Sequence, residues 1–157
     1  MQNIDLQLFL ESYPSDVSYR VCSCNELHFQ LKDNEFIIVN TDPSFLPGQH
    51  WVVFYRNKEG LLEFFDSFGN LPGYYTIDFQ MFVNRNCVKK YYILNPNQIQ
   101  SNDSNICGLY CLLFYVSVVK NQEFNDFLLQ FDNNTYLNDV HCLQKIENLF
   151  NYKFSLK

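Results

Sequence analysis

The chain has 157 residues, a formal net charge of −6 and 47% hydrophobic residues, among them 16 Phe and 11 Tyr. This length suits one domain with a substantial core, so we expect residues 1–157 to form a single domain. The acidic balance argues against a nucleic-acid-binding protein, because such proteins usually present a basic surface.

The sequence shows no sign of export or membrane insertion. Its first residues lack the basic and long apolar regions of a signal peptide. The longest apolar run, Leu109 to Val119, is too short to span a bilayer. We therefore expect an intracellular protein that does not contact membranes. Its cysteines should then be reduced thiols rather than disulfides, and they are Cys22, Cys24, Cys87, Cys107, Cys111 and Cys142.

The first half of the chain alternates apolar segments with turn residues. Residues 4–12 predict a short amphipathic helix, and Glu35 to Asn40 predict a buried strand. After a loop over residues 41–48, His50 to Arg56 and Leu61 to Asp66 predict two strands joined by the turn N-K-E-G. An antiparallel hairpin places the start of its first strand beside the end of its second.

The second half of the chain ends in helices. Residues 77–83 predict a helix, and Val88 to Leu94 predict a strand. A polar loop then leads to an apolar helix that begins near Cys107, with Ser104 or Asn105 as its N-cap. Two amphipathic helices follow, over residues 123–131 and 138–150. Since the strands lie in the middle and the helices at the ends, the predicted class is α+β.

Cys107 is the residue from which the functional prediction starts. A cysteine at a helix N-terminus faces the positive end of the peptide dipoles, which favours the thiolate. His50 and Asp66 lie at the two hairpin ends that strand pairing brings together, so they could supply an imidazolium partner and the carboxylate that orients it. Gln100 and the backbone N–H of Cys107 are candidate donors to an oxyanion. The pattern predicts a cysteine protease with Cys107 as its nucleophile.

Each of these residues, taken alone, has an ordinary structural interpretation. A cysteine before an apolar helix usually fills the core, and a histidine in a strand usually lies at the surface or in a satisfied core position. An aspartate after a strand usually forms a turn. The prediction of a cysteine protease therefore depends on Cys107, His50, Asp66 and Gln100 occurring together.

Four motifs carry a resemblance to a known family. They are I-V-N-T at 38–41, G-Q-H-W at 48–51, F-D-S-F-G at 65–69, and Q-x6-C-G-L-Y-C at 100–111. With these motifs, the chain from about Ile37 to Phe114 resembles the adenovirus-type maturation proteases, the adenains. The family has relatives in virophages and in Polinton/Maverick elements, and its wider clan includes the proteases of SUMO and other ubiquitin-like proteins.

The resemblance implies a papain-like α+β fold in which the catalytic residues follow the chain order His, acid, Cys. It implies a triad of His50, Asp66 and Cys107, with Gln100 at the oxyanion hole and with no metal or cofactor. The implied substrates are capsid or core precursor proteins, which are cleaved during virion maturation. Such an enzyme would act as a monomer in the infected host cell and in the virion.

The chain departs from the adenovirus enzymes in several respects. It is shorter, chiefly after Phe114, and it has Asp66 where those enzymes usually have Glu, a difference that the wider clan tolerates. The adenovirus enzymes are basic and are stimulated by DNA and by a capsid-derived peptide that bonds through a cysteine. Because this chain is acidic, we do not expect activation by DNA. Whether a peptide activates it is left open, and we expect Cys87, which lies near the peptide-bonding position, to be a buried or incidental thiol.

Two other functions compete with this prediction. An isopeptidase that acts on ubiquitin-like modifiers would share the triad and the fold, although 157 residues leave little room for a surface that holds a folded modifier. A binding module with a degenerate site is disfavoured, because all four catalytic positions hold competent residues. A zinc site is not expected either, since the spacings of Cys22, Cys24, His141 and Cys142 match no common zinc motif.

Overall fold

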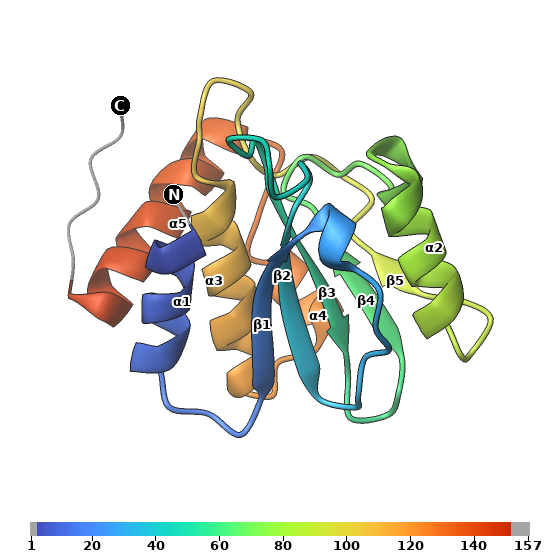
Figure 1. The fold of residues 1–157 in the computed structure, drawn as a ribbon. Coiled ribbons are helices and arrows are strands. Elements are labelled where there is room, and N and C mark those ends of the chain that lie inside the picture. The colour runs from blue at the N-terminus through green and yellow to red at the C-terminus, as the bar shows by residue number, and fades with distance from the viewer. Residues whose placement is uncertain (1–2, 152–157) are drawn as a thin grey trace.

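The computed structural model describes residues 3–151, and a five-stranded mixed sheet lies at its centre (Figure 1). Its strands follow one another in space in chain order: β1 (Ser18–Ser23), β2 (Glu35–Asn40), β3 (Trp51–Arg56), β4 (Leu62–Phe65) and β5 (Ile93–Leu94). Strands β2, β3 and β4 pair antiparallel, whereas β1 and β5 each run parallel to their neighbour.

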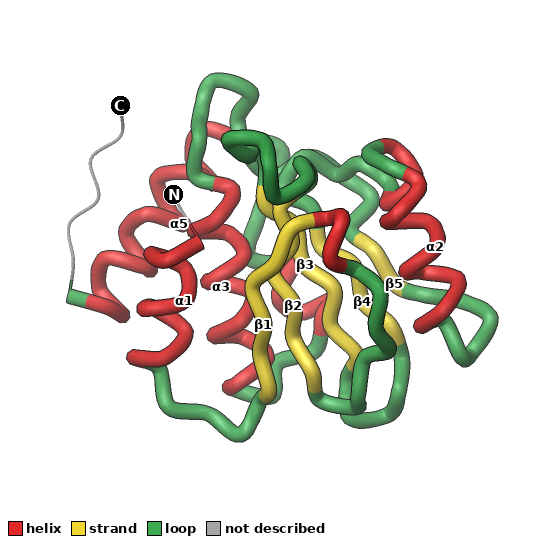
Figure 2. The backbone as a smooth tube through the Cα atoms, in the orientation of Figure 1, coloured by secondary structure: helices red, strands yellow, loops and turns green. Residues whose placement is uncertain are grey.

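Helices pack on both faces of this sheet, and Figure 2 shows the strands between them. One face carries α1 (Asn3–Ser12), α3 (Cys107–Val119), α4 (Phe124–Leu128) and α5 (Thr135–Phe150). The other face carries α2 (Ile77–Asn86) and the short 3-10 helix η1 (Cys24–Glu26), and a second 3-10 helix, η2 (Pro72–Tyr74), precedes α2. The predicted α+β class is confirmed.

The central strands are mostly apolar because they are covered on both faces. Successive side chains of a strand point to opposite faces. Phe36 and Ile38 of β2 pack in the core on the α3 side, whereas Ile37 and Val39 pack in the core on the α2 side. All residues of β2 are buried, which explains why its sequence shows an apolar run rather than an alternation.

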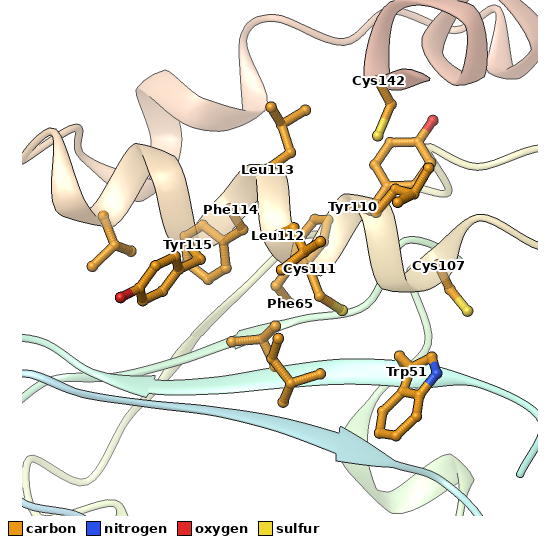
Figure 3. Packing of buried hydrophobic residues seen from close by; sticks show 14 of the residues in the cluster. Trp51, Phe65, Cys107, Tyr110, Cys111, Leu112, Leu113, Phe114, Tyr115 and Cys142 are labelled. Atoms are coloured by element: carbon orange, nitrogen blue, oxygen red, sulfur yellow. The ribbon is translucent and has the colours of Figure 1, made fainter. Parts of the chain in front are cut away.

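Helix α3 forms the centre of the larger core (Figure 3). Its residues from Cys107 to Val118 are all buried, as expected of a helix that is apolar all round. The Phe114 ring packs 5.4 Å from that of Phe65 in β4 and 4.9 Å from that of Phe127 in α4, measured between ring centroids. Burial of one such side chain contributes about 1.5–3 kcal/mol. This packing fixes α3, and therefore Cys107, relative to the sheet.

The structure corrects the predicted boundaries in several places. Strand β1 was not predicted, and the strand expected over 88–94 is reduced to Ile93–Leu94 because Lys90 adopts a left-handed turn conformation with φ 62°. The last two helices are Phe124–Leu128 and Thr135–Phe150 rather than 123–131 and 138–150. Helix α2 likewise continues past the predicted residue 83 to Asn86.

The N-cap prediction for α3 was wrong. The N-cap is Ile106, which makes no side-chain hydrogen bond, rather than Ser104 or Asn105. The Ser104 hydroxyl instead donates to the carbonyl of Ser101 at 3.2 Å, and the backbone carbonyl of Ser104 accepts a hydrogen bond from the Gln100 side chain. Local hydrogen bonding within the loop has therefore replaced capping of the helix.

Candidate active site

The hairpin of β3 and β4 brings His50 and Asp66 together. His50 directly precedes β3, Asp66 directly follows β4, and the antiparallel register pairs Val53 with Phe65. Nε2 of His50 lies 2.6 Å from Oδ1 of Asp66, and both side chains are buried. Because a carboxylate only accepts hydrogen bonds, Nε2 carries a proton toward Asp66 and Nδ1 is left for another partner.

Asp66 is surrounded by hydrogen-bond donors from the turn that follows it. Its Oδ1 accepts the backbone N–H of Phe68 at 2.9 Å, and its Oδ2 accepts the N–H of Asn70 at 3.2 Å and the hydroxyl of Tyr75. The Asn95 side chain holds the backbone, since it accepts the N–H of Asp66 at 3.0 Å and donates to its carbonyl. These donors offset the cost of burying a carboxylate that has no exposed surface.

Cys107 is the first residue of α3 and is 7% exposed. No side chain caps this helix N-terminus, so its positive dipole end is available to the thiol and to a developing anion. Nδ1 of His50 makes no hydrogen bond of full geometry among the described residues, yet the Cys107 thiol is one of the groups that raise the His50 pKa. Cys107 and His50 are therefore neighbours whose contact is looser than the bond to Asp66, and catalytic hydrogen bonds of this kind often tighten when substrate binds.

The electrostatics of the site favour a protonated imidazole. Burial lowers the pKa of His50, but the hydrogen bonds with Asp66 and Cys107 and their charges outweigh it and raise the pKa to about 9. At neutral pH the ring is therefore an imidazolium. Burial raises the pKa of the Cys22 thiol to about 12, and it also raises the pKa values of Cys24, Cys111 and Cys142. Thiols that stay protonated are poor nucleophiles.

Gln100 lies in the loop between β5 and α3, and its side chain is fully buried. Its Oε1 accepts the Ser67 hydroxyl at 2.6 Å, and its Nε2 donates to the carbonyl of Ser104 at 2.8 Å. Since the amide has two hydrogens, the second can serve another acceptor. Gly69, with φ 72°, allows the loop that leads to Gln100 to pass close to the turn after Asp66. A Cβ at Gly69 would lie 2.7 Å from the carbonyl carbon of Asn97 in that loop.

Several residues that hold this site together were not predicted from the sequence. The Phe68 ring lies 4.7 Å from the His50 imidazole between centroids, and Tyr75 and Asn95 bind the side chain and the backbone of Asp66. Phe68 belongs to the F-D-S-F-G motif, which could have indicated it. Tyr75 and Asn95 carried no comparable signal, because only the fold brings them to the carboxylate.

Other sequence predictions concern residues outside this cluster. Cys87 is the C-cap of α2 and is half-buried. Within residues 3–151, no group of three or more His, Cys, Asp or Glu side chains is arranged to hold a metal ion. In that same part of the chain, the helices are too short or too polar to cross a bilayer.

Comparisons with known proteins establish the family. The profile of the adenovirus endoprotease family matches residues 27–150. No curated protein matches the sequence. Among solved structures, the central domain of the uncharacterized Lpg1148 protein from Legionella pneumophila is similar, with a TM-score of 0.51 and 15% identity over 97% of this chain and 98% of that chain. ChlaDub1 from Chlamydia trachomatis aligns with a TM-score of 0.49 and 15% identity over 92% of this chain and 71% of that chain.

The two kinds of comparison support different conclusions. The match to Lpg1148 shows a shared fold and nothing about activity, because its identity is only 15%. The family match covers most of the chain, including all the motifs from 38 to 111, and it confirms the resemblance seen in the sequence. The chain is therefore a member of the adenovirus endoprotease family, which makes it a cysteine protease with a papain-like α+β fold.

Proposed function

We propose that this cysteine protease is an endopeptidase that cleaves viral capsid or core precursor proteins during virion maturation. It would act as a monomer in the infected host cell and in the virion. The observation that carries the assignment of its site is the buried His50–Asp66 hydrogen bond of 2.6 Å beside Cys107, at the uncapped start of α3. Cys107 is the nucleophile in this proposal, His50 its acid–base partner and Asp66 the group that orients the ring.

The first half of the reaction forms an acyl-enzyme. The Cys107 thiolate attacks the scissile carbonyl carbon, a C–S bond forms, and the carbonyl electron pair moves onto oxygen. The N–H of Cys107 and the second amide hydrogen of Gln100 stabilise this oxyanion. As the intermediate collapses, the C–N bond breaks and the His50 imidazolium gives its Nδ1 proton to the leaving amine.

The second half of the reaction returns the enzyme to its starting state. Water attacks the thioester while neutral His50 takes a proton from it, and the C–S bond then breaks to release the acid and the Cys107 thiolate. Throughout, Asp66 holds the ring by its Nε2–H and stabilises the imidazolium that forms. The His50 pKa of about 9 supports this role, since the ring is charged when the amine departs.

The direct test is cleavage of a co-expressed capsid precursor by the purified protein. We expect Cys107→Ala to abolish cleavage and Cys87→Ala, which removes a half-buried thiol at the C-cap of α2, to preserve it. Cleavage that is unaffected by Cys107→Ala would refute the assignment of the nucleophile. No cleavage of any precursor, together with labelling of Cys107 by ubiquitin or SUMO probes, would favour the isopeptidase alternative.

A further inference from the structure

Helix α5 supplies two adjacent side chains to the backbone around Gln100. Nδ2 of Asn138 donates to the carbonyl of Ile99 at 3.1 Å, and the carboxylate of Asp139 accepts the N–H of Ser101 at 3.3 and 3.4 Å. Asn138 and Asp139 are each 4% exposed. The segment is therefore held on both sides of Gln100 by a helix that comes much later in the chain.

Asp139 also binds the helix that begins at Cys107. The Tyr110 hydroxyl donates to Oδ1 of Asp139 at 2.8 Å, and Tyr110 is fully buried one turn after Cys107. Figure 3 shows the Tyr110 ring extending from α3 toward Cys142 on α5. Burial, then Cys142 and Asp139, raise the pKa of Tyr110 far above its ordinary range, so the hydroxyl keeps its proton and remains a donor.

The remaining hydrogen bonds of Asn138 give this arrangement a second anchor. Its Nδ2 also donates to the carbonyl of Asp132 at 2.9 Å, and its Oδ1 accepts the N–H of Asp132 at 3.1 Å. The loop before α5, the first turns of α5 and the Gln100 segment are thus joined. The carboxylate of Asp139 links this unit to α3 through the Tyr110 hydroxyl.

We propose that Asp139 is a positioning residue for the oxyanion hole. By binding Ser101 and Tyr110 with one carboxylate, it sets the distance between the Gln100 amide and the N–H of Cys107. This inference rests on the proposed roles of Gln100 and Cys107. The two donors must be aimed at one oxygen atom, and a misplacement of about 1 Å can lower a reaction rate by about 100-fold.

The test is Asp139→Asn, which keeps the shape of the side chain but turns an NH2 group toward one of the two donors. On a peptide that spans the precursor cleavage site, kcat should fall by about 10- to 100-fold while KM changes little. Affinity for the matching peptide aldehyde should fall in parallel, because its adduct with Cys107 places an oxygen in the same hole. Alkylation of Cys107 by iodoacetamide needs no oxyanion donor and should keep its wild-type rate at every pH.

A second substitution and a control separate positioning from stability. Tyr110→Phe removes one hydroxyl from the same carboxylate and should reproduce the pattern with a smaller loss in kcat. Asn134→Ala removes the α5 N-cap, whose side chain accepts the N–H of Leu137 at 3.1 Å, without changing the Asp139 contacts. It should lower Tm and leave kcat as in the wild type.

A double-mutant cycle decides whether Asp139 acts through Gln100. In a Gln100→Ala background, Asp139→Asn should cause no further loss in kcat. Losses in kcat that multiply in the double variant would overturn the proposal. So would a rate of Cys107 alkylation that falls as far as kcat does in Asp139→Asn. A wild-type kcat for Gln100→Ala would contradict the oxyanion role itself and remove this inference with it, whereas a large Gln100→Ala effect with no Asp139→Asn effect would refute the inference alone.

Discussion

Strand β4 and the residue after it carry two buried carboxylates in contrasting surroundings. Asp66, just after the strand, has no exposed surface and accepts hydrogen bonds from four groups. Glu63, within the strand, is 5% exposed and accepts one hydrogen bond among the described residues, from Asn57 at 3.1 Å. The negative charges of Glu123 and Glu59 also raise the pKa of Glu63.

The difference shows what a buried carboxylate needs. Burial is the largest influence on Glu63, and its pKa rises to about 7 even though the Asn57 hydrogen bond opposes the change. Asp66 is also buried and has the His50 ring and several hydrogen-bond donors around it. Burying a carboxylate costs free energy unless hydrogen bonds and charges of this kind compensate for it. Glu63 lines a cavity of about 140 Å³.

The largest expected effect is that of Asp66→Asn. We expect kcat to fall by about 100-fold or more, because the ring loses the group that orients it and stabilises its charge. In the wild type, activity should decline as pH rises through about 9, where the imidazolium of His50 is lost. In the variant this alkaline limb should move to lower pH. A pH profile of kcat/KM checks both expectations, and an alkaline limb that stays near pH 9 would contradict the assigned cause.

Glu63→Gln tests the other carboxylate and provides the control for Asp66→Asn, since it should leave kcat and the pH profile unchanged. Its effect should be on stability. The pKa of Glu63 is raised from 4.5 to about 7 in the folded state, so the folded state binds more protons between these values and loses stability as pH rises through them. The variant removes this loss. We expect its free energy of unfolding to exceed that of the wild type by about 1–3 kcal/mol above pH 7.

The wild type and Glu63→Gln should differ little in their free energy of unfolding below about pH 4.5, because Glu63 is then protonated in both the folded and the unfolded states. Urea unfolding at pH 4 and at pH 8 measures the difference. A gain in stability that is the same at both pH values would show that replacing the side chain, rather than removing its charge, is responsible.

A smaller loss of activity than that of Asp66→Asn is expected of Tyr75→Phe, which removes one of the donors to Asp66 and keeps the ring. The two backbone donors, from Phe68 and Asn70, remain. One hydrogen bond to a charged group contributes about 1.5–3 kcal/mol at most, and part of it can be replaced by water, so kcat should fall by about 3- to 10-fold. Tyr74→Phe is the matched control, because Tyr74 is 70% exposed. Equal kcat values for the two variants would show that the Tyr75 hydroxyl does not support the carboxylate.

Some features followed from local patterns alone. The hairpin from Trp51 to Phe65 and the helix that begins at Cys107 were predicted because their apolar residues must be buried whichever elements cover them. The same hairpin placed His50 near Asp66, since antiparallel pairing is fixed by the short turn between the strands. The catalytic roles of these residues and of Gln100 remain predictions until the variants are measured.

The family, the α+β class and the kinds of side chain at the site could be predicted from the amino-acid sequence, because contiguous motifs and apolar runs encode them. Only the folded chain shows that β1 joins the sheet edge, that Tyr75 and Asn95 hold Asp66, and that Asp139 reaches the Gln100 segment. These last contacts join residues that lie 9, 29 and 38 positions apart. Hydrogen bonds of this kind depend on how loops pass one another over a packed core, and no periodicity in the chain records that path.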